Sequence, residues 1–180
     1  NKYCAECIYT GMMTDTGKFT FNSNNPEIYY IIGELIRKGI NKDEIYHKVY
    51  NNYSANRMKL MGHLLANKMY IFKELKTSLM ILSLEDQEKY NFQIGDSEGF
   101  VNLPLSIDGV IFSAFFKEDK NRIKVSLRSQ GSFPVNEVCE KHFNGGGHLN
   151  AAGGEVLLSL EDTVKLFNNI LPEYKDLLNK

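Results

Sequence analysis

The sequence of 180 residues lacks a long apolar run, a strong excess of charge and a set of paired cysteines. No apolar run approaches the roughly 18 residues of a membrane-spanning helix, and no signal peptide opens the chain, so we expect no membrane partner. A net charge of −1 argues against binding long nucleic acid by overall charge, for which a basic excess is expected. Three cysteines without the spacing of a disulfide framework fit a reducing compartment and predict a cytoplasmic protein.

The start of the chain has two unusual features. It begins at Asn1 without an initiator methionine and soon enters an apolar stretch, so we expect a fragment or a processed product. Cys4 and Cys7 form a C-x-x-C pair, but no second pair follows, which argues against a zinc site.

Helical patterns dominate residues 25–75. Asn25 and Pro26 form an N-cap and first-turn pair, apolar residues then follow on one face, and Gly39 ends the run, which predicts a helix over 26–38. Asn41 and Glu44 resemble a capping box and predict a second helix. A third helix is predicted to start at Ser54, with its core stripe made of Met58, Met61, Leu65, Met69 and Phe72. We interpret these helices as a connector between two structural units.

From residue 77 onward the pattern is that of strands, followed by helices. Val110–Phe116 is apolar on both faces, as in an interior strand, and residues 122–128 alternate between apolar and polar, so the two runs predict a hairpin. A helix ending at Phe143, a strand over Glu155–Leu158 and a closing helix over Leu160–Leu178 are also expected. Strands flanked by helices predict an α+β domain.

A glycine run, Gly145–Gly147, precedes His148. Successive glycine N–H groups can form an anion-binding concavity, and the histidine adds a donor for a phosphate or carboxylate oxygen. The alternative is a flexible loop with an incidental histidine. The amphipathic helix before the run weighs against it, but glycine-rich motifs often match by chance, and both readings stay open.

Two further side chains are candidates for binding. Arg128 ends a strand on its polar face, where a guanidinium could hold a phosphate with two hydrogen bonds, although a solvated strand-end arginine is the alternative. Asp15, in Thr14–Gly17, is a good ligand type for a hard divalent metal, and an Asx-turn is the alternative. Phe19 and Phe21 after it predict a short strand.

These motifs together resemble a known family. Asn144-Gly145-Gly146-Gly147-His148 with Ala151-Ala152-Gly153 downstream, Ser126-Leu127-Arg128-Ser129 upstream, and Thr14-Asp15-Thr16-Gly17 near the start resemble the C-terminal half of DHH/DHHA1 phosphoesterases. The likeness is greatest to the bifunctional oligoribonucleases and pAp phosphatases, and it covers nearly the whole chain in the same order.

The resemblance implies an organisation and a function. It implies that residues 1–24 are a remnant of an N-terminal DHH catalytic domain, 25–75 a helical connector, and 76–180 a DHHA1 domain with a mixed β-sheet flanked by helices. The parent would be a manganese-dependent phosphoesterase acting on short single-stranded RNA or on nucleotide 3′,5′-bisphosphates such as pAp. By match to the motifs, Asp15 would be a metal ligand, and Arg128, His148 and the backbone of Gly145, Gly146 and Gly147 would bind substrate. Asn102 is a weaker candidate for substrate contact.

The sequence also departs from the family. It contains no Asp-His-His motif, so we expect the two-metal Mn²⁺ centre to be incomplete here and the chain alone to bind nucleotide weakly without hydrolysing it. Other DHH chemistries remain open, namely a pyrophosphatase, a cyclic-dinucleotide phosphodiesterase or a single-strand exonuclease, as do a non-catalytic nucleic-acid-binding module and a homodimer. Asp15-Thr16-Gly17 and Ile31-Ile32-Gly33 also resemble two elements of aspartic proteases. The helix predicted over residues 26–38 conflicts with that alternative, which needs Ile31-Ile32-Gly33 in extended chain.

Overall fold

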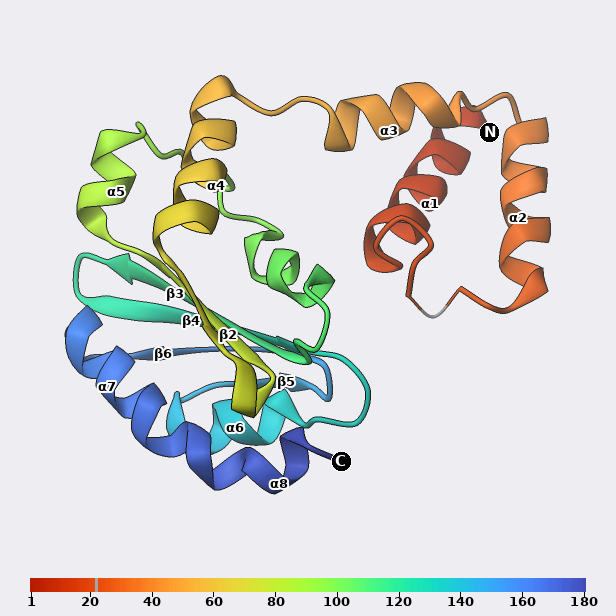
Figure 1. The fold of residues 1–180 in the computed structure, drawn as a ribbon. Coiled ribbons are helices and arrows are strands. Elements are labelled where there is room, and N and C mark those ends of the chain that lie inside the picture. The colour runs from red at the N-terminus through yellow and green to blue at the C-terminus, as the bar shows by residue number, and fades with distance from the viewer. Residues whose placement is uncertain (22) are drawn as a thin grey trace. The chain divides into compact units, whose positions relative to one another are not determined.

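A computed structural model describes residues 1–21 and 23–180, which form two compact units, Asn1–Tyr53 and Ser54–Lys180 (Figure 1). The domain boundaries expected from the sequence, after residues 24 and 75, stay predictions. Among the described residues, no helix is both long and apolar enough to cross a membrane.

The N-terminal unit is made of three helices, α1 (Lys2–Asp15), α2 (Pro26–Arg37) and α3 (Lys42–Tyr50). Asn25 caps α2 by accepting a hydrogen bond from the N–H of Glu27, and Asn41 caps α3 by accepting one from Glu44. Both helices were predicted from these caps. Their small core is formed by Ala5, Tyr9, Met13, Leu35 and Ile40.

The end of α1 differs from the sequence prediction. Residues 16–20 form a turn, so the short strand expected through Phe19 and Phe21 is wrong. Gly17, Lys18 and Phe19 all have positive φ, between 54° and 65°. The carbonyl oxygen of Thr16 holds this left-handed turn by accepting hydrogen bonds from the N–H groups of Thr20 and Phe21.

The C-terminal unit is built around a six-stranded sheet with strand order β1-β2-β3-β4-β6-β5. The strands β2 and β3 pair in parallel, and the other neighbours are antiparallel, so the sheet is mixed and the fold is α+β, as predicted. The elements in chain order are α4 (Ala55–Asn67), β1 (Met69–Phe72), the 3₁₀ helix η1 (Lys73–Leu75), β2 (Thr77–Leu82), α5 (Leu84–Lys89), the 3₁₀ helix η2 (Phe100–Ser106), β3 (Phe112–Asp119), β4 (Arg122–Ser129), α6 (Val135–His142), β5 (Gly146–His148), β6 (Ala151–Val156), α7 (Leu160–Ile170), the 3₁₀ helix η3 (Leu171–Tyr174) and α8 (Lys175–Leu178).

Helices cover both faces of the sheet (Figure 1). On one face, α6 and α7 enclose the main core, in which Phe167 packs against Phe112 and Phe116. On the other face, α4 and η2 cover a second cluster that includes Leu60, Leu64, Met80, Phe100 and Phe115. The predicted hairpin is the pair β3–β4, whose buried residues alternate along β4 as expected.

Two sequence predictions in this unit need correction. The methionine stripe after Ser54 is wrong, because α4 ends at Asn67 and Met69 and Phe72 belong to β1, while Met58 is 47% exposed. Leu60 and Leu64 form the buried face of α4 instead. The last predicted strand begins earlier, at Ala151, and the closing helix is interrupted by the 3₁₀ turn at Pro172.

Candidate functional site

The strand register brings two of the predicted binding residues close together. Arg128, near the end of β4, pairs with Ala151 on β6, and Ala151 pairs with His148 on β5. Because neighbouring strands lie about 4.8 Å apart, the Cα atoms of Arg128 and His148 are roughly 10 Å apart. The side chain of His148 is exposed to solvent. The row therefore offers a fixed cation and an imidazole at one end of the sheet.

The guanidinium of Arg128 is half-buried and held by the backbone. Its Nη1 donates to the carbonyl oxygen of Leu127 at 2.8 Å and to that of Ala152 at 3.4 Å. Burial lowers the pKa of Arg128 below its usual value, and the carboxylate of Glu98 acts in the opposite direction. Arginine stays protonated in proteins, so the result is a partly desolvated cation, which attracts an anion more strongly than one in bulk water.

Gly146 and Gly147 lie in a strand, which argues against the flexible loop that was one of the two readings of the glycine run. Residues 146–148 are β5, which turns back through Leu149 and Asn150 into β6. A Cβ atom at Gly145 would lie 2.2 Å from the carbonyl oxygen of Gly153, and one at Gly147, where φ is +149°, would lie 2.4 Å from that of Ala151. Two of the three glycines are therefore required by close backbone packing within the hairpin. Their contact with substrate stays a prediction.

The turn between β5 and β6 is tied to the end of β4. Asn150 donates from Nδ2 to Ser129 Oγ at 2.9 Å and to the carbonyl oxygen of Gly131 at 3.0 Å, and Ser129 Oγ donates to the carbonyl oxygen of Phe133. These bonds fix the position of His148 relative to Arg128. Asn150 and Ser129 were not predicted, although an asparagine three residues after a glycine run is a turn signal. Leu149, in the same turn, is 49% exposed.

Asn102 lies exposed in η2, above the same sheet face as Arg128. Phe100, in the same element, packs edge-on against Phe115 of β3. Phe115 is two residues from Ser113, the register partner of Arg128, so the three side chains share a face. Gln130 joins η2 to the end of β4 by donating to the carbonyl oxygen of Leu105 at 3.0 Å.

Two buried serines lie beside Arg128 in the same row and were not predicted. Ser78 pairs with Ser113, and Ser113 pairs with Arg128. Both serines are fully buried, and within the described residues neither hydroxyl has a hydrogen-bond partner. An unpaired buried hydroxyl costs about 1–3 kcal/mol of folding free energy, and a hydrogen bond to either serine would recover part of that cost.

Asp15 is the last residue of α1, exposed, in the other unit. Among residues 1–21 and 23–180, no three His, Cys, Asp or Glu side chains cluster in a way that could hold a metal ion. Cys4 and Cys7 are both exposed on α1. A two-metal centre needs several carboxylates and imidazoles, so the described residues do not form one around Asp15.

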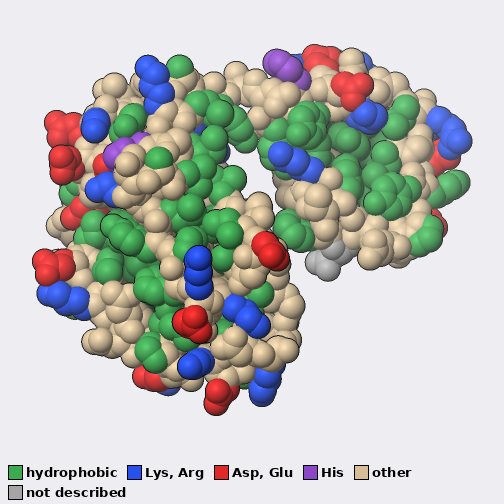
Figure 2. Space-filling view, in the orientation of Figure 1, with side chains coloured by type: hydrophobic (Ala, Val, Ile, Leu, Met, Phe, Trp, Pro, Cys, Tyr) green, Lys and Arg blue, Asp and Glu red, His purple; other side chains and the backbone are tan. Residues whose placement is uncertain are grey.

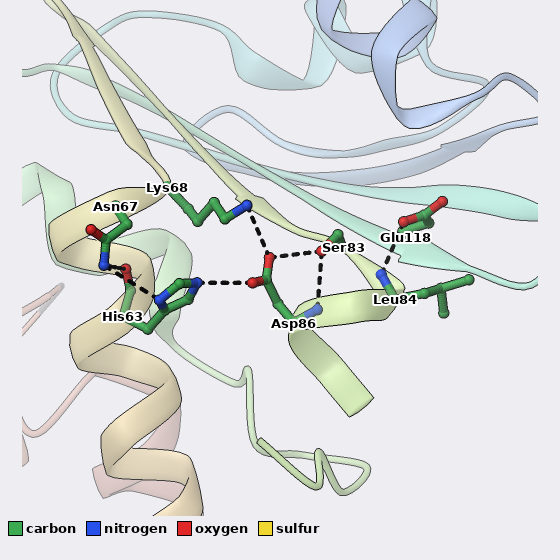
Figure 3. Close-up of polar contacts among 7 residues, drawn as sticks. All are labelled: His63, Asn67, Lys68, Ser83, Leu84, Asp86 and Glu118. Carbon is green, nitrogen blue, oxygen red and sulfur yellow. Dashed lines mark hydrogen bonds and ion pairs between the residues drawn. The ribbon is translucent and has the colours of Figure 1, made fainter. Parts of the chain in front are cut away.

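A separate polar cluster joins α4 to α5 (Figure 3). The carboxylate of Asp86 lies 2.8 Å from His63 Nε2, 2.7 Å from Ser83 Oγ and 3.5 Å from Lys68 Nζ. Burial alone would raise the pKa of Asp86, but the hydrogen bonds from Ser83 and His63, together with Lys68, lower it. Serine and histidine both bind the carboxylate and not each other, so the cluster is no nucleophile–base relay, and it serves to tie the two helices.

The match to a known protein family falls within the C-terminal unit. The DHHA1 domain family matches residues 74–173, more than half of the chain. The bifunctional oligoribonuclease and PAP phosphatase NrnA of Bacillus subtilis is 29% identical over 156 residues, which is 87% of this chain and 48% of that protein. The protein of the same name from Thermus thermophilus is 30% identical over 146 residues, 81% of this chain and 43% of its own length. This chain thus spans about half the length of these relatives.

Solved structures show the same fold. An exopolyphosphatase-related protein from Bacteroides fragilis superimposes with a TM-score of 0.97 and 57% identity, over 100% of this chain and 53% of that one. A pGpG-specific phosphodiesterase from Vibrio shares the fold at a TM-score of 0.53 with 17% identity, over 92% of this chain and 56% of that one. On the match over residues 74–173, the chain belongs to the DHHA1 domain family.

Proposed function

We propose that this chain supplies substrate binding in a DHH-type phosphoesterase that hydrolyses short RNA oligonucleotides or 3′-phosphoadenosine 5′-phosphate. The names of the Bacillus and Thermus relatives support this substrate class. The observation that carries the proposal is the row Arg128–Ala151–His148, in which a partly desolvated guanidinium and an exposed imidazole lie on two strands separated by β6. Such a pair suits a phosphate group, because guanidinium and imidazole N–H groups both donate to its oxygens.

The residues divide the task of binding. Arg128 is the anchor for a phosphate, since backbone carbonyl oxygens already fix its orientation and little side-chain freedom is lost on binding. His148 supplies a second donor from β5, and the backbone of Gly145, Gly146 and Gly147 is the further candidate for contact with the phosphate. Asn102, on η2, is the candidate for contact with the remainder of the nucleotide.

Asp15 is the one residue of this chain that we assign to manganese, as a ligand of a metal site in the whole phosphoesterase. The donor set of the described residues does not fit a complete two-metal centre. We therefore derive no hydrolytic step for this chain and expect it to bind substrate without cleaving it.

Calorimetric titration tests the proposal, using 3′-phosphoadenosine 5′-phosphate and a 5′-phosphorylated RNA dinucleotide with and without Mn²⁺. We expect binding that does not depend on Mn²⁺ and that Arg128→Ala weakens by about tenfold or more, as is typical for loss of a charge-assisted hydrogen bond. His148→Ala should weaken it less. Arg122→Ala is the matched control, because Arg122 lies on the same strand but pairs with Glu155. Wild-type affinity in both the Arg128 and the His148 variants would refute the proposal.

A further inference from the structure

The neighbouring strands β4 and β6 leave an open strip beside Arg128. Along β4, Lys124, Ser126 and Arg128 alternate with buried apolar residues and are half-exposed. Their partners on β6 are Glu155, Gly153 and Ala151, in that order. Cross-strand partners share a face, so these six residues form one surface, with Ser126 and Gly153 in its middle.

The fold itself does not require a glycine at position 153. The nearest heavy atom to a Cβ built there is the carbonyl oxygen of Val125 at 3.5 Å, an ordinary contact. At the adjacent Gly154, by contrast, the Cβ would lie 2.2 Å from the carbonyl oxygen of Phe143. Gly153 is exposed and lies within a strand, a position that glycine weakens. Close approach of an external group is the remaining physical reason for a bare backbone here.

One end of the strip has a buried polar group without a partner. Ser113 is fully buried, pairs in register with Arg128, and within the described residues its hydroxyl makes no hydrogen bond. Register partners face the same side, so Ser113 and Arg128 share this face of the sheet. This end of the strip is therefore suited to a ligand with several oxygen atoms.

At the other end, two lysines lie opposite each other. Lys117 on β3 pairs with Lys124 on β4, a like-charge arrangement that is unfavourable across strands. Asp119 lies 3.7 Å from Lys124 Nζ but also 3.7 Å from Arg122, so its charge is shared. An anion bound between the lysines would relieve their repulsion. Lys124 is four residues from Arg128, about 13 Å along the strand.

We propose that this strip, from Arg128 over Gly153 to the Lys117–Lys124 pair, binds the nucleotides that follow the terminal one in a single-stranded oligonucleotide. The inference rests on the proposed function, in which Arg128 and His148 hold the terminal phosphate. The next sugar and base lie on the bare backbone at Gly153, and a later phosphate lies between the lysines. Contacts to phosphate, sugar and backbone do not depend on base identity, so the strip recognises chain length rather than sequence.

The test compares a 5′-phosphorylated RNA pentanucleotide with 3′-phosphoadenosine 5′-phosphate, which is too short to reach the lysines. Gly153→Val should weaken pentanucleotide binding by roughly tenfold, because its side chain occupies the space of the ligand, and change bisphosphate binding by less than about twofold. Its stability in urea should be unchanged or higher, since valine favours strands. A glycine with a purely structural role would give lower stability instead.

Lys124→Gln supplies an independent measurement. It should weaken pentanucleotide binding and reduce the slope of log K against log salt by about 0.7, the value for one lost contact to a single strand. Lys120→Gln, at the exposed tip of the β3–β4 hairpin, is the control and should leave the slope unchanged.

The outcomes separate this inference from the proposed function. Unchanged pentanucleotide affinity in both the Gly153 and Lys124 variants, with binding still dependent on Arg128, would overturn the strip alone. Affinity that is equally insensitive to Arg128→Ala would overturn the proposed function and the strip with it.

Discussion

The two units of the chain differ in how much of their apolar surface they bury. The C-terminal unit has clusters on both faces of its sheet, with Phe112, Phe116 and Phe167 at most 1% exposed. The N-terminal unit buries one cluster of five residues and leaves many large apolar side chains exposed (Figure 2). They include Tyr3, Ile8, Phe21, Tyr29, Tyr30, Ile31, Ile36, Tyr46 and Tyr53. Helix-forming sequence alone therefore does not make a stable unit, because most of the free energy of folding comes from burial.

The largest effect expected from this difference appears on separating the units. Residues 54–180 alone should keep a cooperative unfolding transition in urea, because their core and sheet are complete. Residues 1–53 alone should show little helix by circular dichroism at 25 °C, since a chain of that size buries too little surface. A cooperative unfolding transition in the isolated N-terminal piece would contradict the expected difference in stability between the two units.

A smaller effect is expected from adding one methyl group at a glycine in each unit. Gly154→Ala places Cβ 2.2 Å from a backbone oxygen and should lower the free energy of unfolding by about 3 kcal/mol or more. Gly33→Ala in α2 meets no heavy atom within 4 Å and should stabilise the N-terminal unit by about 0.5–1 kcal/mol. Urea denaturation measures both changes. Equal effects at the two positions would show that the packing around β6 is looser than the distances indicate.

The smallest effect depends on pH and concerns the C-terminal unit. Burial, with a contribution from Lys141, lowers the pKa of His142, whose Nε2 lies 2.9 Å from Tyr174 Oη. The unfolded chain then binds more protons than the folded one, so stability is complete above about pH 6.5 and falls as the pH drops below that value. His142→Gln should flatten this dependence for residues 54–180. An unchanged pH profile in the His142 variant would contradict the assignment.

Local signals in the sequence predicted much of the secondary structure. The caps at Asn25 and Asn41 each bind the backbone a few residues ahead, so the information is contained in one short segment. The alternation along β4 was also readable, because a strand with one buried face repeats every second residue.

Features that depend on distant contacts could not be read in this way. The glycine run is a strand only because β6 returns beside it, and Met69 leaves the helical pattern only because β1 pairs with β2. Arg128 and His148 were both candidates, yet their closeness follows from the position of β6 between β4 and β5. Ser113 gave no signal, since a serine in an apolar run is unremarkable until its burial is known.

The strand order also bears on how the protein behaves at high concentration. Its longest strands, β3 and β4, with eight residues each, are paired on both sides, whereas the edges are formed by β1 with four residues and β5 with three. A sheet edge is a template for the strand of another molecule, and short edges with glycine hold such a strand poorly. Placing the glycine-rich hairpin at the edge therefore gives this sheet a built-in resistance to aggregation by strand addition.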